Sequence, residues 1–123
     1  MSDPYARLDF VVRKNEDWID PLPRAVFQAL FNPQTIEGQT LLMEVKNASG
    51  NPLLSISVAS GYLHIRDAQR CRATIVVPIS ALKLIPDGTF STDMVATEVS
   101  TGVTRVVFVG SVKFERGTSE AGT

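Results

Sequence analysis

Apolar and polar residues alternate with a period of two along much of this 123-residue chain. In the first such segment, Leu8, Phe10 and Val12 alternate with residues that include Asp9 and Arg13. This alternation is typical of antiparallel strands that have one face on a core and the other in solvent. Later segments are rich in Val, Thr, Ile and Phe, which suit a pleated sheet. The alternating segments are 8–13, 41–46, 54–58 and 62–66, and the later ones are 71–77, 89–99 and 103–114.

Turn-forming residues separate these segments. In the clearest turn, 47–52, Gly50 can adopt a positive φ and Pro52 cannot donate a hydrogen bond to a strand ladder. Three other glycine-containing turns follow, at 59–61, 86–88 and 100–102. We therefore predict an all-β, antiparallel β-sandwich of about seven or eight short strands.

Two apolar segments do not fit the alternation. Segment 79–84 lies between prolines and is compatible with one helical turn. Segment 23–31, PRAVFQALF, is compatible with a buried strand or with a short helix that has Pro23 at its first position. We predict a strand for 23–31, because its neighbours are predicted strands.

The length predicts a single domain. We expect an N-terminal arm at 1–7, a β-sandwich at 8–116 and a flexible tail at 117–123, since the tail contains only small and polar residues.

Composition narrows the possible partners. Twelve basic and 13 acidic residues give a net charge of −1, which provides no electrostatic reason to expect a nucleic acid or an anionic membrane as partner. No segment approaches the roughly 20 apolar residues of a membrane-spanning helix. The single cysteine, Cys71, excludes an internal disulfide.

Catalytic and metal-binding patterns are not evident in the sequence. His64, the only histidine, falls on the polar side of a predicted strand, and Cys71 is expected to be a buried structural thiol rather than a nucleophile. The acidic cluster of Glu16, Asp17 and Asp20 lacks the glycine and the carboxylate spacing of a calcium loop. We expect no enzymatic activity, no cofactor, no metal and no small-molecule substrate. A small enzyme that uses His64 as its base is a rival interpretation.

Basic residues gather in the segment HIRDAQRCR, which contains Arg66, Arg70 and Arg72. We interpret this segment as a hairpin turn with charged flanks. A nucleic-acid-binding surface would need a broader patch with interleaved aromatic residues.

Three residues are candidates for a subunit interface. Trp18 is the only tryptophan and lies in a polar stretch, where it either covers the edge of the sandwich or anchors an interface. Val107 and Val109 belong to a last strand that is apolar on both faces. Either a neighbouring copy covers this strand, or the strand is central and sandwiched on both sides.

The order of several sequence elements resembles a known family. The elements are LDFVVRKNEDWIDPL at 8–22, GQTLLMEVK at 38–46, the turn Pro86–Phe90, and a last strand with Gly110 at its centre. Together they are similar to small phage virion proteins with an immunoglobulin-like β-sandwich, as found at the N-terminus of siphophage upper baseplate proteins. The similarity runs from about residue 8 to 114, and segment 23–37 departs from it because it is longer and more apolar.

The resemblance implies a structural component of a phage tail, neck, baseplate or fibre. Such a protein would be made in the host cytoplasm, become part of the virion, and assemble with copies of itself and with other virion proteins. An alternative is a carbohydrate- or host-surface-binding module. That function would need an exposed aromatic platform, for which Trp18 and Tyr62 are the candidates.

Overall fold

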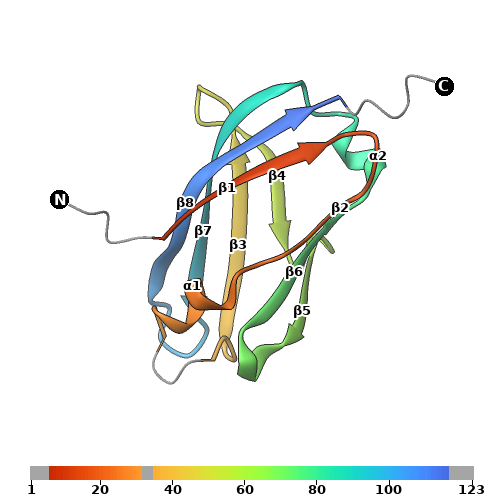
Figure 1. Cartoon of the computed structure of the whole chain (residues 1–123). Helices are drawn as coiled ribbons and strands as arrows, with labels where there is room; N and C mark the ends of the chain where they lie inside the picture. The colour runs from red at the N-terminus through yellow and green to blue at the C-terminus, as the bar shows by residue number, and fades with distance from the viewer. Residues whose placement is uncertain (1–5, 32–34, 117–123) are drawn as a thin grey trace.

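The protein is described by a computed structural model that covers residues 6–31 and 35–116 (Figure 1). This part of the chain contains eight strands and three short helices. The strands are β1 (Ala6–Arg13), β2 (Trp18–Pro21), β3 (Gln39–Lys46), β4 (Pro52–Ser57), β5 (Leu63–Asp67), β6 (Arg72–Val77), β7 (Gly88–Glu98) and β8 (Thr104–Glu115). The helices are α1 (Arg24–Gln28), the 3₁₀ turn η1 (Ala68–Arg70) and α2 (Ile79–Leu82).

The strands form two sheets around one hydrophobic core. One sheet has five strands in the order β1-β8-β7-β3-β4, and the other has three in the order β2-β6-β5. The predicted all-β class is confirmed. The chain passes from the first sheet to the second between β1 and β2, so both sheets have an edge strand on the same side of the molecule (Figure 1).

One strand pair differs from the prediction. β1 lies parallel to β8, with Ala6 opposite Phe108 and Arg13 opposite Glu115, whereas the other paired strands are antiparallel. A purely antiparallel sandwich was therefore wrong. Strands joined by a hairpin must run antiparallel, but β1 and β8 are separated by most of the chain, and their relative direction is free to be parallel.

The alternation of buried and exposed residues follows the predicted pattern in most strands. Phe10 and Val12 of β1 face the core, as do Met43 and Val45 of β3. The alternation was wrong at Val58, because β4 ends at Ser57 and Val58 lies in the following turn. It was also wrong at Ile65, which is exposed where the pairing of β5 with β6 shifts register.

Segment 23–31 contains a helix, so the predicted strand was wrong. Helix α1 begins at Arg24, one residue later than the helical alternative placed it, and Pro23 occupies the preceding cap position. Phe27 and Phe31, four residues apart, are both buried, and Phe31 N–H donates to the Phe27 carbonyl at 3.0 Å. A backbone hydrogen bond between residues four apart closes a helical turn, and an extended strand cannot make it.

Segment 79–84, which the sequence left compatible with one helical turn, contains α2. Its first N–H group, on Ile79, donates to Asp17 Oδ1 at 2.8 Å. The segment between β1 and β2 thus supplies a carboxylate that accepts a hydrogen bond from a backbone N–H group at the start of α2, which has no partner within the helix.

The predicted turns at 47–52, 59–61 and 100–102 connect strands, whereas 86–88 leads from α2 into β7. In 47–52, Asn47 Oδ1 accepts hydrogen bonds from Ser49 N at 2.9 Å and from Asn51 N at 3.1 Å, and Gly50 has a φ of 84°. That φ is in the left-handed region, which glycine adopts without steric cost.

The first strand overlaps the expected N-terminal arm. Strand β1 starts at Ala6, so the last two residues of the expected 1–7 arm belong to the sheet. The rest of that arm and the expected tail at 117–123 lie outside the described residues. No helix in the described ranges is long and apolar enough to cross a membrane.

Candidate functional site

The candidate site is the side of the molecule where the edge strands β1 and β2 lie, one from each sheet. A shallow groove of about 190 Å³ runs between them and is lined by residues from 11–13 and 16–20. In the described ranges, β1 makes strand hydrogen bonds only to β8, and β2 only to β6. The outer backbone groups of both strands therefore face outward without a strand partner.

Two exposed apolar side chains accompany these backbone edges. Val11 of β1 is 65% exposed, and Ile19 of β2 is 63% exposed. Both line the groove. An exposed edge strand with apolar side chains is a surface on which another chain can add a strand.

Trp18 lies beneath this groove and belongs to the core. It is 5% exposed, and its ring packs edge-on against Phe10, with ring centres 5.7 Å apart, and against Phe114, with centres 6.2 Å apart. The structure thus places Trp18 where it covers the core at the edge of the sandwich. Its side chain presents almost no surface to a partner.

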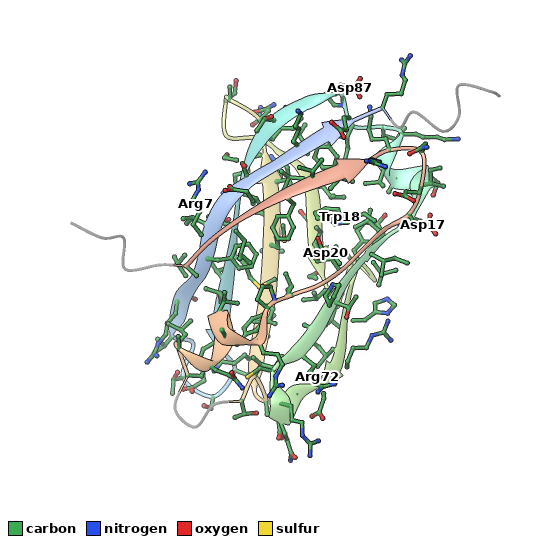
Figure 2. All side chains as sticks on the ribbon, viewed as in Figure 1. Arg7, Asp17, Trp18, Asp20, Arg72 and Asp87 are labelled. Atoms are coloured by element: carbon green, nitrogen blue, oxygen red, sulfur yellow. The ribbon has the colours of Figure 1, made fainter. Side chains whose placement is uncertain are left out.

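Asp20 lies beside Trp18 on β2 (Figure 2). The indole Nε1–H of Trp18 donates to Asp20 Oδ2 at 3.5 Å, a long hydrogen bond. Partial burial raises the pKa of Asp20, and the contact with Trp18 offsets only part of that effect. The carboxylate is therefore held in a less favourable environment than water.

Val107 and Val109 belong to β8, which lies between β1 and β7. Val107 is 3% exposed, and Val109 is half-buried. Both backbone edges of β8 are paired within the chain. Helix α1 also packs against β8, and Val26 and Leu30 lie beside Val107, so this side chain is covered within the chain.

Trp18, an interface candidate from the sequence, lies in the same stretch as the groove, whereas Val11 and Ile19 were missed. Val11 occupies a polar position in the alternation of the first strand, which is a usable signal of an exposed apolar residue. Ile19 gives no comparable signal, because its own strand, β2, has only four residues and is too short to show a period.

His64 and Cys71 lie in different environments. His64 is exposed, with Nε2 at 3.2 Å from the Gly61 carbonyl oxygen. Cys71 is fully buried, and burial raises the pKa of its thiol. Within the described residues, no group of three or more His, Cys, Asp and Glu side chains is placed to hold a metal ion.

The acidic and basic clusters of the sequence both lie in and around connections between strands. Asp17 of the acidic cluster accepts the hydrogen bond from the first N–H group of α2. The segment with Arg66, Arg70 and Arg72 forms the predicted hairpin connection through η1.

Aromatic side chains in 6–31 and 35–116 are all buried or half-buried, including Tyr62. An aromatic platform for carbohydrate is therefore not exposed in this part of the chain.

No protein-family model matches the chain, and no curated protein sequence matches it.

Proposed function

We propose that this protein is a non-catalytic structural component of a bacteriophage particle, located in the tail, neck, baseplate or a fibre. It is made in the host cytoplasm and enters the virion by binding copies of itself and other virion proteins. The observation that carries the proposal is the open side of the sandwich, where two edge strands expose Val11 and Ile19.

The finer fold that we propose is an immunoglobulin-like sandwich. In the immunoglobulin arrangement, strands B, E and D lie in one sheet, and C, F and G lie in the other, which can be extended by C′. Reading β2 to β8 as B, C, C′, D, E, F and G reproduces both sheets: β2-β6-β5 is B-E-D, and β8-β7-β3-β4 is G-F-C-C′. This order supports the resemblance to phage virion sandwiches that the sequence elements indicate.

The energetics of the open side favour association. Covering a Val or Ile side chain contributes roughly 1.5–3 kcal/mol when burial is complete. A strand added to β1 or β2 would also pair backbone groups that otherwise face water. Backbone pairing with apolar contacts is a common way for one chain to extend the sheet of another.

The test is a measurement of mass in solution by light scattering over a concentration series. We expect the unmodified chain to form a discrete oligomer and the Val11→Asp/Ile19→Asp variant to be monomeric, because a charge on an edge strand opposes strand addition. A matched control, Val58→Asp/Val99→Asp, places the same charges on exposed apolar residues outside the groove and should leave the oligomer intact.

Two outcomes would count against the proposal. An unmodified chain that stays monomeric at high concentration would remove self-assembly through this side. An oligomer that persists in the Val11→Asp/Ile19→Asp variant would place the interface elsewhere. Trp18→Ala is unsuitable for this test, because emptying the core there would cost about 3–5 kcal/mol of stability and disturb any assembly indirectly.

A further inference from the structure

A second groove lies next to the hairpin of β5 and β6 and has a different chemistry. It has a volume of about 310 Å³. Arg24 at the start of α1, Arg66 of β5 and Arg72 of β6 line it together. Figure 2 shows Arg72 beside η1, at the end of the three-stranded sheet. We call this surface the arginine groove; its lining is Pro21, Leu22, Arg24, Arg66, Arg72, Ala73 and Thr74.

The charges in the arginine groove are not compensated locally. In the described ranges, no ion pair joins Arg24, Arg66 or Arg72 to a carboxylate. The nearby carboxylate of Asp67 is already engaged, since its Oδ2 accepts from Arg70 at 2.8 Å and its Oδ1 from the Arg70 N–H at 3.3 Å. Three exposed guanidinium groups therefore face one groove, and each repels the others.

One of these side chains is held in place by the fold. Arg24 Nε donates to the carbonyl oxygen of Arg70 at 3.0 Å. This bond ties the first residue of α1 to the end of η1, and within residues 6–31 and 35–116 no carboxylate pairs with the terminal nitrogens of Arg24. Part of the conformational entropy that a binding arginine normally loses has thus already been lost in the free protein.

The lining restricts the kind of ligand. Guanidinium groups bind carboxylates and phosphates through paired hydrogen bonds. Pro21, Leu22 and Ala73 add an apolar floor, which suits a ligand with hydrocarbon next to its negative charges. A nucleic-acid backbone needs a longer basic track. Lys14, outside this groove, is already paired with Asp87 at 2.6 Å and does not extend one.

We propose that the arginine groove binds an acidic segment of a partner protein, with Arg24, Arg66 and Arg72 donating hydrogen bonds to its Asp or Glu carboxylates. The groove shares no lining residue with the groove between β1 and β2, so this inference does not rest on the proposed phage function. Loss of one surface should leave the other intact.

The experiment is a fluorescence-anisotropy titration at low salt with a fluorescein-labelled peptide of alternating Glu and Ala. The same peptide with Gln in place of Glu is the uncharged control. We expect only the Glu peptide to bind, and we expect Arg66→Gln/Arg72→Gln to weaken binding about tenfold or more, because two charged hydrogen-bonding groups are lost. Raising the salt concentration should weaken binding further by screening.

A matched variant separates the groove from total charge. Arg7→Gln/Lys113→Gln also removes two exposed positive charges, but outside the arginine groove, and should bind the Glu peptide like the unmodified chain. Thermal unfolding of both variants verifies that each remains folded.

Three results would overturn the proposal: equal binding of the Glu and Gln peptides, equal weakening by the two double variants, or no binding of the Glu peptide. A labelled single-stranded oligonucleotide forms a further arm. If it bound more tightly than the peptide and lost affinity in Arg66→Gln/Arg72→Gln, the groove would be a nucleic-acid site instead.

Discussion

Asp20 and Asp9 are carboxylates on the two edge strands β2 and β1, and they lie in opposite environments. Asp20 is partly buried beside Trp18, and its pKa is raised. Asp9 is exposed on β1 and accepts hydrogen bonds from Ser111 N at 3.1 Å and Ser111 Oγ at 2.9 Å. These bonds lower the pKa of Asp9. Ionisation therefore works against folding at one residue and in its favour at the other.

The Asp20→Asn variant should be more stable than the unmodified chain at neutral pH. A raised folded-state pKa means that the folded protein holds the Asp20 proton more tightly than the unfolded chain does. Stability is consequently lost as the pH rises from the ordinary value of 3.8 through the raised pKa. The advantage of Asn should disappear below pH 3.8, as measured by thermal unfolding at neutral and acidic pH.

Asp9→Asn serves as the control of opposite sign. Because the pKa of Asp9 is lowered on folding, its ionised form stabilises the protein above pH 3.8, and this contribution is lost as the pH falls through the folded pKa. Asn at this position should lower the melting temperature at neutral pH. Equal shifts for Asp20→Asn and Asp9→Asn would contradict the burial argument.

At the scale of elements, the pairing of β1 with β8 depends on Gly110. Leu8 lies opposite Gly110, and a Cβ atom at residue 110 would collide with the Leu8 carbonyl oxygen. The obstacle is backbone, which cannot rotate away as a side chain would. The central glycine of the last strand, which is also part of the family resemblance, therefore has a steric role in this fold.

We expect Gly110→Ala to destabilise the protein by about 1–3 kcal/mol, the usual cost of forcing an extra methyl group into a closely packed position. Urea unfolding measures this cost. Hydrogen exchange should show reduced protection in β1, whereas the pairing of β3 with β7 should remain protected. Lys113→Ala, at an exposed residue of β8, is the control and should have little effect. Uniform loss of protection across both sheets would contradict a local collision.

At the scale of the whole molecule, sequence periodicity predicted which residues form strands better than it predicted how strands combine. Phe10, Val12, Met43 and Val45 are buried as expected, because a period of two directly reports a strand with one buried face. Helix α1 was mistaken for a strand because a helix of five residues is too short to show its own period.

Features that depend on distant residues could not be read from local patterns. The parallel pairing of β1 with β8 joins opposite ends of the described chain. The arginine groove likewise forms only because Arg24 lies beside the β5–β6 hairpin, which follows much later in the sequence. The basic segment of the sequence therefore contained Arg66 and Arg72 of this groove but not Arg24. The buried position of Trp18 depends on Phe10 and Phe114, one from each of two strands.

The parallel arrangement of β1 and β8 has a mechanical consequence. Ala6, at the start of β1, and Glu115, at the end of β8, lie at opposite ends of the paired stretch. Tension that pulls these two residues apart slides the strands along each other, so the load falls on all of their hydrogen bonds at once. In an antiparallel pair such as β7 and β8, Gly88 and Phe114 lie opposite each other, and pulling them apart breaks one bond at a time.

Single-molecule force spectroscopy can compare these two geometries. Handles at Ala6 and Glu115 should give a higher rupture force than handles at Asp87, an exposed residue next to the start of β7, and Glu115. Equal rupture forces would show that the β1–β8 pair does not bear the load. A higher force along the first direction would show that this sandwich resists shear between the start of β1 and the end of β8.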